Sequence, residues 1–392
     1  MKILMINVTC GTGSTGRICT DLAEVLERNG HNVKIAYGRD KVPKNSKKYA
    51  IKIGNNFDIY THVLRSRLFD DMGFGSKHAT ETFLKWVDKF DPDVVHLHNI
   101  HGYYINIELL FKYLIQKQKK VIWTLHDCWS FTGHCAYFDY VGCNKWINGC
   151  IHCSQRNEYP ARLFFDKSKE HYFKKKELFT SLKDVTLVTP SDWLADLVRK
   201  SYLKKYKVIT IHNGINTDIF KYRQSDFKQQ YGLENKKIVL GVTSVWDTRK
   251  GLNIFYELSN LLSDDYKIVL VGLNKKQIKH IPDNIIGIEK TENIIKLAEI
   301  YSAAFVFVNP TFEDNYPTTN LEAIACGTPV ITFDTGGSRE SASNYGIVLH
   351  KKNAYEIVKN LNSALKIKYN SHIKLDCEDM LKQYIKLYNE QI

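Results

Sequence analysis

The stretch KILMINVTCGTGSTGRICTDLAEVLERNG, residues 2–30, contains an apolar run, a glycine-rich loop and an amphipathic segment in direct succession. The run KILMINV predicts a buried strand. A helical stripe of apolar side chains follows the loop, formed by Ile18, Leu22, Val25 and Leu26. The loop GTGSTGR, residues 11–17, matches G-x-G-x-x-G, and N–H groups at such a helix start can hold a phosphate. The stretch therefore predicts one strand–loop–helix unit of a doubly wound sheet.

The same alternation of short β-branched runs and helical patterns continues along the chain. In the first half the runs are KILMINV, VKIAYG, DVVHLHN, KVIWTLHD, VTLVTPSD and KVITIHNG. In the second half they are KIVLGVTS, KIVLVG, IIGI, AFVFVNP, PVITFDTG and YGIVLH. Continuous apolar runs separated by helices indicate parallel strands that are buried on both faces. The fold class is therefore α/β, with two doubly wound domains whose ligands lie beyond the carboxyl ends of the strands.

The domain boundary is expected in the stretch IHNGINTDIF, where a strand ends in Asn-Gly and a polar segment follows. We predict a first domain over residues 1–213, with a cysteine-rich insertion at 128–157, and a second domain over 214–374. Residues 375–392 form a terminal amphipathic helix. Its apolar face consists of Met380, Leu381, Tyr384, Leu387 and Tyr388.

Composition narrows the class of protein. The chain has 392 residues, and 55 Lys and Arg against 42 Asp and Glu give a net charge of +13. Such a surplus suits nucleic acid, anionic lipid or phosphorylated ligands, although basic clusters at 174–176 and 199–207 are equally well explained as solvated helix faces. We find neither an apolar run of about 18 residues nor a signal-peptide cleavage site, and so expect a cytoplasmic protein.

The glycine loop alone does not identify its ligand. A dinucleotide-binding fold needs an acid at the end of its second strand to bind the ribose. That strand, VKIAYG, ends in Tyr37 and Gly38, and Asp40 follows only after Arg39. NAD is therefore disfavoured, whereas Arg39 keeps NADP open. A tight turn that binds no ligand is a further alternative.

A more specific indication of a ligand site is the segment NPTFEDNYPTTNLEAIACGTPVITFDTGGSRE, residues 309–340. A helix is expected to begin near Thr319, and the free N–H groups of Thr318, Thr319 and Asn320 suit a diphosphate. Glu322 could bind a ligand or close a capping box with Thr319.

This segment resembles the signature of family 4 of the retaining glycosyltransferases, in which an acid, seven residues and a glutamate precede A-x-A-C-G-x-P-V. Asp314 and Glu322 have that spacing, and AIACGTPV follows. The tetrapeptide Asp314-Asn315-Tyr316-Pro317 resembles the E-D-N-aromatic-P pattern of bacterial capsule and exopolysaccharide transferases. Either Asp314 or Glu313 could meet the sugar, and the spacing favours Asp314. The resemblance implies two Rossmann-like domains that face each other across a cleft, the GT-B fold.

Other segments extend the resemblance over the full chain. In SVWDTRKGL, Lys250 matches the family's diphosphate-binding lysine, but Val245 stands where the family has arginine, so Arg249 is the candidate substitute. A solvated helix start is the alternative for this pair. The terminal helix resembles one that crosses back onto the first domain. In TLHD, His126 resembles the histidine that touches the donor sugar.

The segment HLHNIH adds three histidines near a strand end, which could form a metal site or pack and line the acceptor. They are His96, His98 and His101.

The resemblance implies retaining transfer from a nucleotide-sugar donor, with UDP as the expected carrier. The acceptor would be a lipid-linked polysaccharide precursor at the inner face of the cell membrane, where the protein is peripheral, and no nucleic acid or catalytic cofactor is involved. The implied catalytic residues are His126 and Asp314. The implied donor-binding residues are Gly13, Gly16, Arg249, Lys250, Asn315, Tyr316, Thr318, Thr319 and Glu322. The alternatives are a nucleotide-sugar epimerase of the same fold and a zinc-stapled nucleic-acid-binding protein.

The insertion contains four cysteines in the spacing C-x7-C-x6-C-x2-C. They are Cys135, Cys143, Cys150 and Cys153, and Cys128 and His152 are spare candidate ligands. Four thiols in a long loop fit a structural zinc site. The alternative is that they remain unligated and pack as small hydrophobic side chains.

Overall fold

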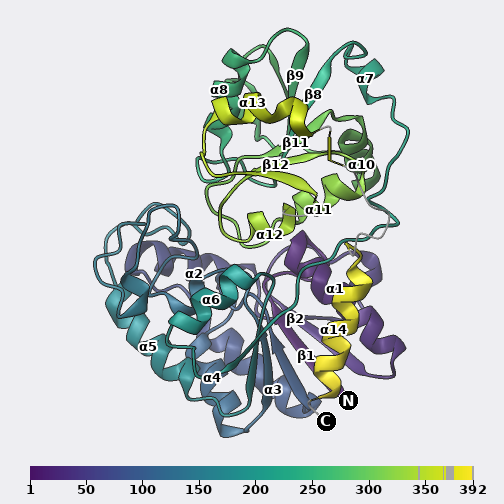
Figure 1. Ribbon diagram of the computed structural model, residues 1–392. Coiled ribbons are helices and arrows are strands. Elements are labelled where there is room, and N and C mark those ends of the chain that lie inside the picture. Colours follow the sequence, from purple (N-terminus) through teal and green to yellow (C-terminus); the bar gives the residue numbers. More distant parts are fainter. Residues whose placement is uncertain (343–344, 365, 368–374, 391–392) are drawn as a thin grey trace. The chain divides into compact units, whose positions relative to one another are not determined.

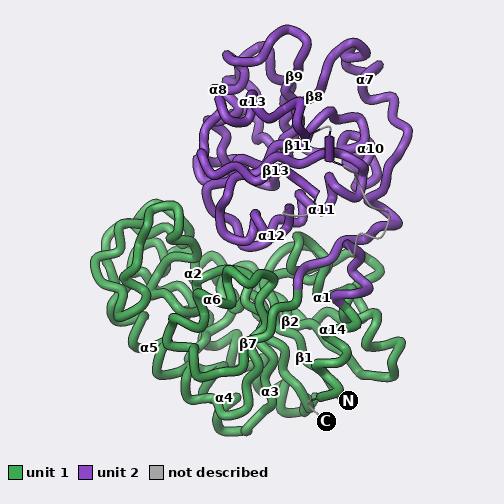
Figure 2. The backbone as a smooth tube through the Cα atoms, viewed as in Figure 1, with its two compact units in different colours: residues 1–211, 381–392 green, residues 212–380 purple. Residues whose placement is uncertain are grey.

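The computed structural model describes residues 1–342, 345–364, 366–367 and 375–390. The chain divides into two compact units, and these are coloured separately in Figure 2. Unit 1 comprises Met1–Ile211 and Leu381–Ile392, and unit 2 comprises His212–Met380. Each unit is built on one parallel sheet, which confirms the predicted α/β class. Within the described ranges, no helix is both long and apolar enough to cross a bilayer.

Unit 1 contains a seven-stranded sheet in the order β3-β2-β1-β4-β5-β6-β7. Its strands are β1 (Lys2–Asn7), β2 (Asn32–Tyr37), β3 (Ala50–Lys52), β4 (Val94–Leu97), β5 (Lys120–Thr124), β6 (Val185–Thr189) and β7 (Lys207–Thr210). Its helices are α1 (Gly13–Arg28), α2 (Asn56–Phe69), α3 (Lys77–Phe90), α4 (Ile107–Gln116), α5 (Ser168–Thr180) and α6 (Asp192–Lys200). The strand order reverses between β1 and β4, where such sheets bind ligands.

Unit 2 contains a six-stranded sheet in the order β10-β9-β8-β11-β12-β13. Its strands are β8 (Lys237–Val242), β9 (Tyr266–Val271), β10 (Ile285–Ile288), β11 (Val306–Asn309), β12 (Val330–Phe333) and β13 (Gly346–Leu349). Its helices are α7 (Phe227–Gln230), α8 (Leu252–Leu261), α9 (Lys275–Ile278), α10 (Ile294–Ala303), α11 (Thr318–Ala325), α12 (Ser338–Ala342) and α13 (Ala354–Ala364). Here the order reverses between β8 and β11.

The central strands of both units are buried, and in Figure 1 the sheets lie between helices. In β1 the side chains of residues 3–6 are 0% exposed, and so are residues 238–240 in β8. These continuous apolar runs leave no face for solvent, as expected of parallel strands covered on both sides.

The last helix, α14 (Cys377–Asn389), contributes to the core of unit 1. The Tyr384 hydroxyl lies 3.0 Å from the Thr124 hydroxyl, and the Tyr388 hydroxyl lies 2.6 Å from Nδ1 of His96. The apolar residues of the expected face are all buried. The final helix therefore covers side chains at the ends of β4 and β5.

Of the two interpretations of the basic run at 174–176, a solvated helix face does not fit its middle residue. Lys175 is only 1% exposed, and its ammonium lies 3.7 Å from the centre of the Trp129 ring and 2.5 Å from the Trp129 carbonyl oxygen. Burial lowers the pKa of Lys175 to about 7. Neighbouring Lys176 is exposed. The run thus has one structural lysine, because the aromatic ring and the carbonyl offer the ammonium a partly compensated site.

Candidate functional site

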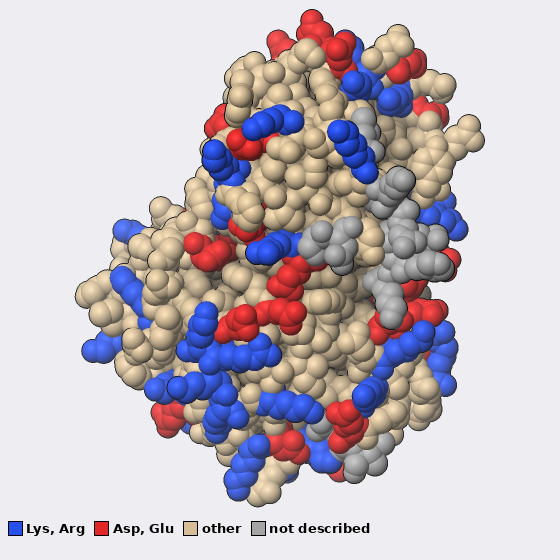
Figure 3. Space-filling model, in the orientation of Figure 1, with Lys and Arg blue, Asp and Glu red and all other residues tan. Residues whose placement is uncertain are grey.

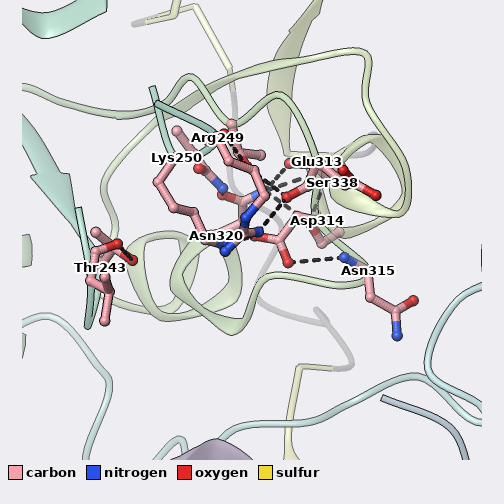
Figure 4. A network of polar contacts seen from close by, with 12 residues as sticks. Thr243, Arg249, Lys250, Glu313, Asp314, Asn315, Asn320 and Ser338 are labelled. Atoms are coloured by element: carbon pink, nitrogen blue, oxygen red, sulfur yellow. Dashed lines mark hydrogen bonds and ion pairs between the residues drawn. The ribbon is translucent and has the colours of Figure 1, made fainter. Parts of the chain in front are cut away.

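In unit 2 the loops that follow β8 and β11 carry oppositely charged side chains at the reversal of strand order. The Lys250 ammonium lies 2.5 Å from Oδ2 of Asp314, as Figure 4 shows, and both side chains are about four-fifths buried. The backbone N–H of Lys250 donates to Asp247 at 2.7 Å. A cation and an acid are therefore fixed at the position where doubly wound sheets bind ligands.

Arg249 joins the two loops to each other. Its Nη1 donates to the Glu313 carbonyl oxygen at 2.9 Å, and its own carbonyl oxygen accepts from the Phe312 N–H at 2.8 Å. Glu313 is 1% exposed. The guanidinium thus cross-links the two loops beside Lys250. Of the neighbouring acids Glu313 and Asp314, Asp314 is the less buried.

Two glycines allow the loops to approach closely. Gly251 has φ +77° and Gly336 has φ +52°, both in the left-handed region. A Cβ at Gly251 would lie 2.3 Å from the Pro310 carbonyl oxygen, and one at Gly336 would lie 2.1 Å from that of Asp314. Any side chain at either position would push apart the segments that hold Lys250 and Asp314.

Helix α11 begins beside this pair, at Thr318, and Pro317 is its N-cap. Thr319 lies inside the helix and the cap has no side-chain hydrogen bond, so the capping box with Glu322 is not formed. The N–H of Asn320 donates to the Pro317 carbonyl oxygen at 3.2 Å. The N–H groups of Thr318 and Thr319 therefore open the helix, ahead of the bonded N–H of Asn320.

Glu322 lies on the buried side of α11. It is 6% exposed, and its Oε2 accepts a hydrogen bond from the Tyr301 hydroxyl at 3.1 Å. Burial, followed by the charge of Glu322, raises the pKa of Tyr301. A buried carboxylate that is held by a phenol can still accept hydrogen bonds from ligand hydroxyls.

Asn315 and Tyr316 connect the acid to the helix. The N–H of Asn315 donates to Oδ1 of Asp314 at 2.9 Å. The Tyr316 ring stacks on the His212 ring, with 5.0 Å between ring centres and 6° between planes. The loop is therefore ordered by Asp314 within it and by His212 outside it.

A buried amide network below α11 was missed by the sequence analysis. Asn320 accepts from Nδ2 of Asn309 at 2.9 Å and donates to the Ser341 hydroxyl at 2.8 Å. The Ser338 hydroxyl lies 2.7 Å from that of Thr332. The polar residues that end the apolar runs of β11 and β12 were the available signal. The network ties α11 and α12 to both strands.

In unit 1 the glycine loop forms the predicted strand-to-helix turn. Gly11 and Gly13 have φ +75° and +67°. A Cβ on Gly16 would lie 2.5 Å from the Thr9 hydroxyl oxygen, whereas one on Gly13 would meet no heavy atom within 4 Å. Gly16 is thus required by packing, and the surroundings of Gly13 are open.

His126 follows β5 and pairs with a second histidine. Its Nε2 lies 3.1 Å from Nδ1 of His98. The His126 ring is partly exposed but closely surrounded by protein, and this desolvation lowers its pKa to about 4. His126 is therefore neutral at pH 7. The nitrogens of His96 lie next to Tyr388 and Thr124, so the three histidines of HLHNIH do not converge on a metal position.

An acid–histidine–tyrosine chain lies beside His126. Nε2 of His101 is 2.7 Å from Asp127, and Nδ1 of His101 is 2.8 Å from the Tyr159 hydroxyl. Burial opposes ionisation of Asp127, but its histidine neighbours and the Trp129 N–H more than offset this, so its pKa is lowered. Local spacing does not predict this chain, because Tyr159 lies 58 residues from His101.

The four cysteines of the insertion lie in or against one apolar cluster. Within the described ranges, no three of their sulfurs lie within 4.8 Å of one another. The S–H of Cys135 bonds Cys153, which lowers the pKa of Cys153 to about 6 and raises that of Cys135. This arrangement is a thiol pair with two neighbours and does not yet fit a tetrahedral zinc site.

Two family models match the chain. The one described as "Glycosyltransferase Family 4" matches residues 15–219, and the one described as "Glycosyl transferases group 1" matches residues 223–383. The relative "Putative colanic acid biosynthesis glycosyl transferase WcaC" of Escherichia coli strain K12 is 26% identical over 362 residues, which cover 88% of this chain and 86% of that protein.

Two further comparisons agree with these matches. The "N,N'-diacetylbacillosaminyl-diphospho-undecaprenol alpha-1,3-N-acetylgalactosaminyltransferase" of Campylobacter jejuni is 26% identical over 221 residues, 50% of this chain and 58% of that protein. The structure of Anabaena Alr3699/HepE in complex with UDP is 13% identical with a TM-score of 0.67 over 100% of both chains, and that protein is also solved with UDP-glucose. The chain belongs to glycosyltransferase family 4 and has the GT-B fold.

Proposed function

We propose that this glycosyltransferase moves a sugar, with retention of configuration, from a UDP-sugar to a lipid-linked polysaccharide precursor at the inner face of the cell membrane. The names of the Escherichia and Campylobacter relatives, with colanic acid and an undecaprenyl diphosphate, support this class of acceptor. The UDP complexes of the Anabaena protein support the donor. No comparison favours an epimerase or a nucleic-acid-binding protein.

The observation that carries the proposal is the Lys250–Asp314 pair beside the start of α11. We infer that the donor diphosphate binds the Lys250 ammonium and the N–H groups of Thr318 and Thr319. A cation and a helix N-terminus stabilise the charge that develops on a leaving diphosphate. Asp314, released from Lys250, would then accept hydrogen bonds from the sugar hydroxyls.

We infer the remaining donor contacts from the positions of the neighbouring side chains. Glu322 would bind the ribose hydroxyls with the carboxylate that Tyr301 holds. Asn315 and Tyr316 would flank the sugar, and Arg249 would keep the two loops together as well as add positive charge. Of the glycine loop in unit 1, Gly13 is the position with room for a ligand.

Retaining transfer passes through an oxocarbenium-like transition state. We propose front-face attack, in which the acceptor oxygen bonds to the anomeric carbon as the diphosphate leaves and the donor phosphate takes the acceptor's proton. A neutral His126 would hydrogen-bond the sugar without adding positive charge beside it. This chemistry requires no catalytic metal.

The structural zinc of the insertion stays a prediction. It requires Cys143 and Cys150 to move toward the Cys135–Cys153 pair, so that four thiolates surround the ion. Elemental analysis of the purified protein checks this: we expect about one zinc per chain and loss of zinc in Cys153→Ser. A content far below one would contradict the prediction.

Transfer is tested by incubating the protein with UDP-sugars and a synthetic polyprenyl-diphosphate saccharide. We expect a lengthened glycolipid whose new linkage has the donor's anomeric configuration by NMR. An inverted linkage would contradict retention, and donor turnover without an acceptor product would favour an epimerase.

A further inference from the structure

His98 directly follows β4, where the strand order of unit 1 reverses. Its backbone N–H donates to the Ile6 carbonyl oxygen of β1 at 2.9 Å. Its ring contacts two other histidine rings: the centre of the His96 ring is 4.0 Å away, and that of the His126 ring is 5.4 Å away. His98 is 2% exposed, whereas the His126 ring is partly exposed. Any effect of His98 on a ligand therefore passes through His126.

The rings of His98 and His126 share one well-aligned hydrogen bond. Nδ1 of His98 lies 3.1 Å from Nε2 of His126, and the two ring planes differ by 14°. The nitrogens are closer to each other than the ring centres are by about one ring radius on each side, so both nitrogens lie near the line between the centres. The rings are thus almost edge to edge, and the N–H of one points at the lone pair of the other.

Both rings are neutral near pH 7. Burial lowers the pKa of His126 to about 4 and that of His98 well below its usual range. The net charge of +13 acts in the same direction, and Figure 3 shows Lys and Arg side chains distributed over the visible face of unit 1. A neutral histidine has one N–H and one bare ring nitrogen. The pair therefore has two possible arrangements, which differ in the ring that donates.

The second ring nitrogen of His98 distinguishes these arrangements. Nε2 of His98 is buried and has no hydrogen-bond partner among the described residues. If His126 donated, His98 would carry its proton on this nitrogen, and a buried N–H without a partner is rare because it loses its hydrogen bond to water. If His98 donates from Nδ1, its one N–H is used and only a ring lone pair is left without a partner. The second arrangement is therefore favoured.

We propose that His98 is a positioning residue that holds His126 in the tautomer with its proton on Nδ1. His98 donates to Nε2 of His126, so that His126 donates from Nδ1 and has no second nitrogen with which to take a proton. In catalysis, this makes His126 a hydrogen-bond donor to an oxygen of the donor sugar and not the base for the acceptor. This consequence rests on the proposed function, whereas the tautomer does not.

Nitrogen NMR of the full chain tests the tautomer without any substrate. With nitrogen-15 in the histidine rings, a nitrogen that bears a proton resonates at a frequency distinct from that of a bare nitrogen. The signals of His126 are identified by their loss in His126→Gln. At pH 7 we expect a proton on Nδ1 of His126 and a bare Nε2. A proton on Nε2 instead, or on both nitrogens, would overturn the inference.

Two variants at position 98 connect the tautomer to turnover. In His98→Asn the side-chain amide can donate from nearly the position of Nδ1, so the tautomer of His126 and most of kcat should persist. His98→Leu removes the donor. We expect a mixture of the two His126 tautomers in this variant and a kcat about 100-fold lower, with little change in KM for the UDP-sugar. The matched control is His78→Asn at an exposed histidine, which should behave like the unchanged protein.

The outcomes separate positioning from packing and from failure of the proposed function. An unchanged tautomer and kcat in His98→Leu would overturn the positioning role, and so would equal losses of kcat in His98→Leu and His98→Asn. If His98→Leu does not fold, a shift of the His126 proton to Nε2 in His98→Asn contradicts the inference. If the unchanged protein turns over no UDP-sugar, the proposed function fails, and the nitrogen signals still decide the tautomer.

Discussion

At the scale of single residues, the donor site of unit 2 depends on how each charge is neutralised in the free protein. Lys250 is held by Asp314, and Glu322 by the Tyr301 hydroxyl. A buried charge without a partner would be costly. A bound donor must therefore replace the Lys250–Asp314 contact, whereas it can add hydrogen bonds to Glu322 while Tyr301 stays in place. Substitutions at these two positions are expected to have different effects.

Glu322→Gln tests whether this carboxylate binds the donor or only Tyr301. We expect donor affinity to fall at least about tenfold, because an amide accepts the ribose hydroxyls less strongly than a carboxylate. The control is Tyr301→Phe, which removes the internal hydrogen bond to Glu322 but keeps the acid. It should lower the free energy of unfolding by about 1 kcal/mol and leave donor affinity nearly unchanged. Equal donor affinity in Glu322→Gln and the unchanged protein would make the residue structural.

Sequence reasoning located residues better than it located their partners. Asp314, Glu322 and Lys250 stand out by spacing, and they lie at the reversal of strand order in unit 2. By contrast, neither interpretation of the run at 174–176 included a buried lysine, because nothing in a run of three lysines signals that Trp129, 46 residues away, lies beneath the middle one. Contacts between distant segments depend on register and packing, which a local pattern does not contain.

At the scale of elements, the alternation of apolar runs and helical stripes predicted the fold class, since parallel strands must be apolar on both faces. The insertion was harder to predict. Its cysteine spacing suggested four equivalent ligands, whereas the structure brings Cys135 and Cys153 into contact, and no three of the four described sulfurs are close enough together to share one ion. Irregular loops have no period from which side-chain positions could be deduced.

Helix α14 offers a test of how an element far along the chain stabilises unit 1. Tyr388 is 0% exposed and its hydroxyl lies beside His96. Tyr388→Ala should lower the free energy of unfolding by about 3–5 kcal/mol, the usual cost of deleting a buried aromatic ring. Lys386→Ala, on the exposed side of the same helix, should change it by less than about 0.5 kcal/mol. Similar stabilities in urea unfolding would contradict the packing of this helix.

At the scale of the whole molecule, the stability should depend on pH through the buried histidines of unit 1. The pKa is lowered by burial in His62, His126 and His171, to about 4 in each. Such groups bind protons in the unfolded chain from about pH 6.5 downward but stay neutral in the folded protein. The stabilisation is therefore complete above pH 6.5 and lost as the pH falls toward 4.

Urea unfolding between pH 7 and about 4.5 measures this dependence. We expect the free energy of unfolding to fall by at least about 3 kcal/mol, since each histidine contributes up to about 1.4 kcal/mol per pH unit. Replacement of exposed His78 by alanine should leave the slope unchanged. A stability that is constant over this range would show that these histidines are protonated as readily in the folded protein as in the unfolded chain.

The central claim is that a sugar-nucleotide diphosphate binds unit 2 at Lys250 and the start of α11. Its most direct test is calorimetric titration of UDP-sugars into the unchanged protein, Lys250→Ala and the exposed control Lys276→Ala. Our account predicts one binding site in the unchanged protein. The affinity should be about 100-fold weaker in Lys250→Ala, because a charge-assisted contact is lost, and it should not change in the control. Equal affinity in all three proteins, or no binding of any UDP-sugar to the unchanged protein, would contradict it.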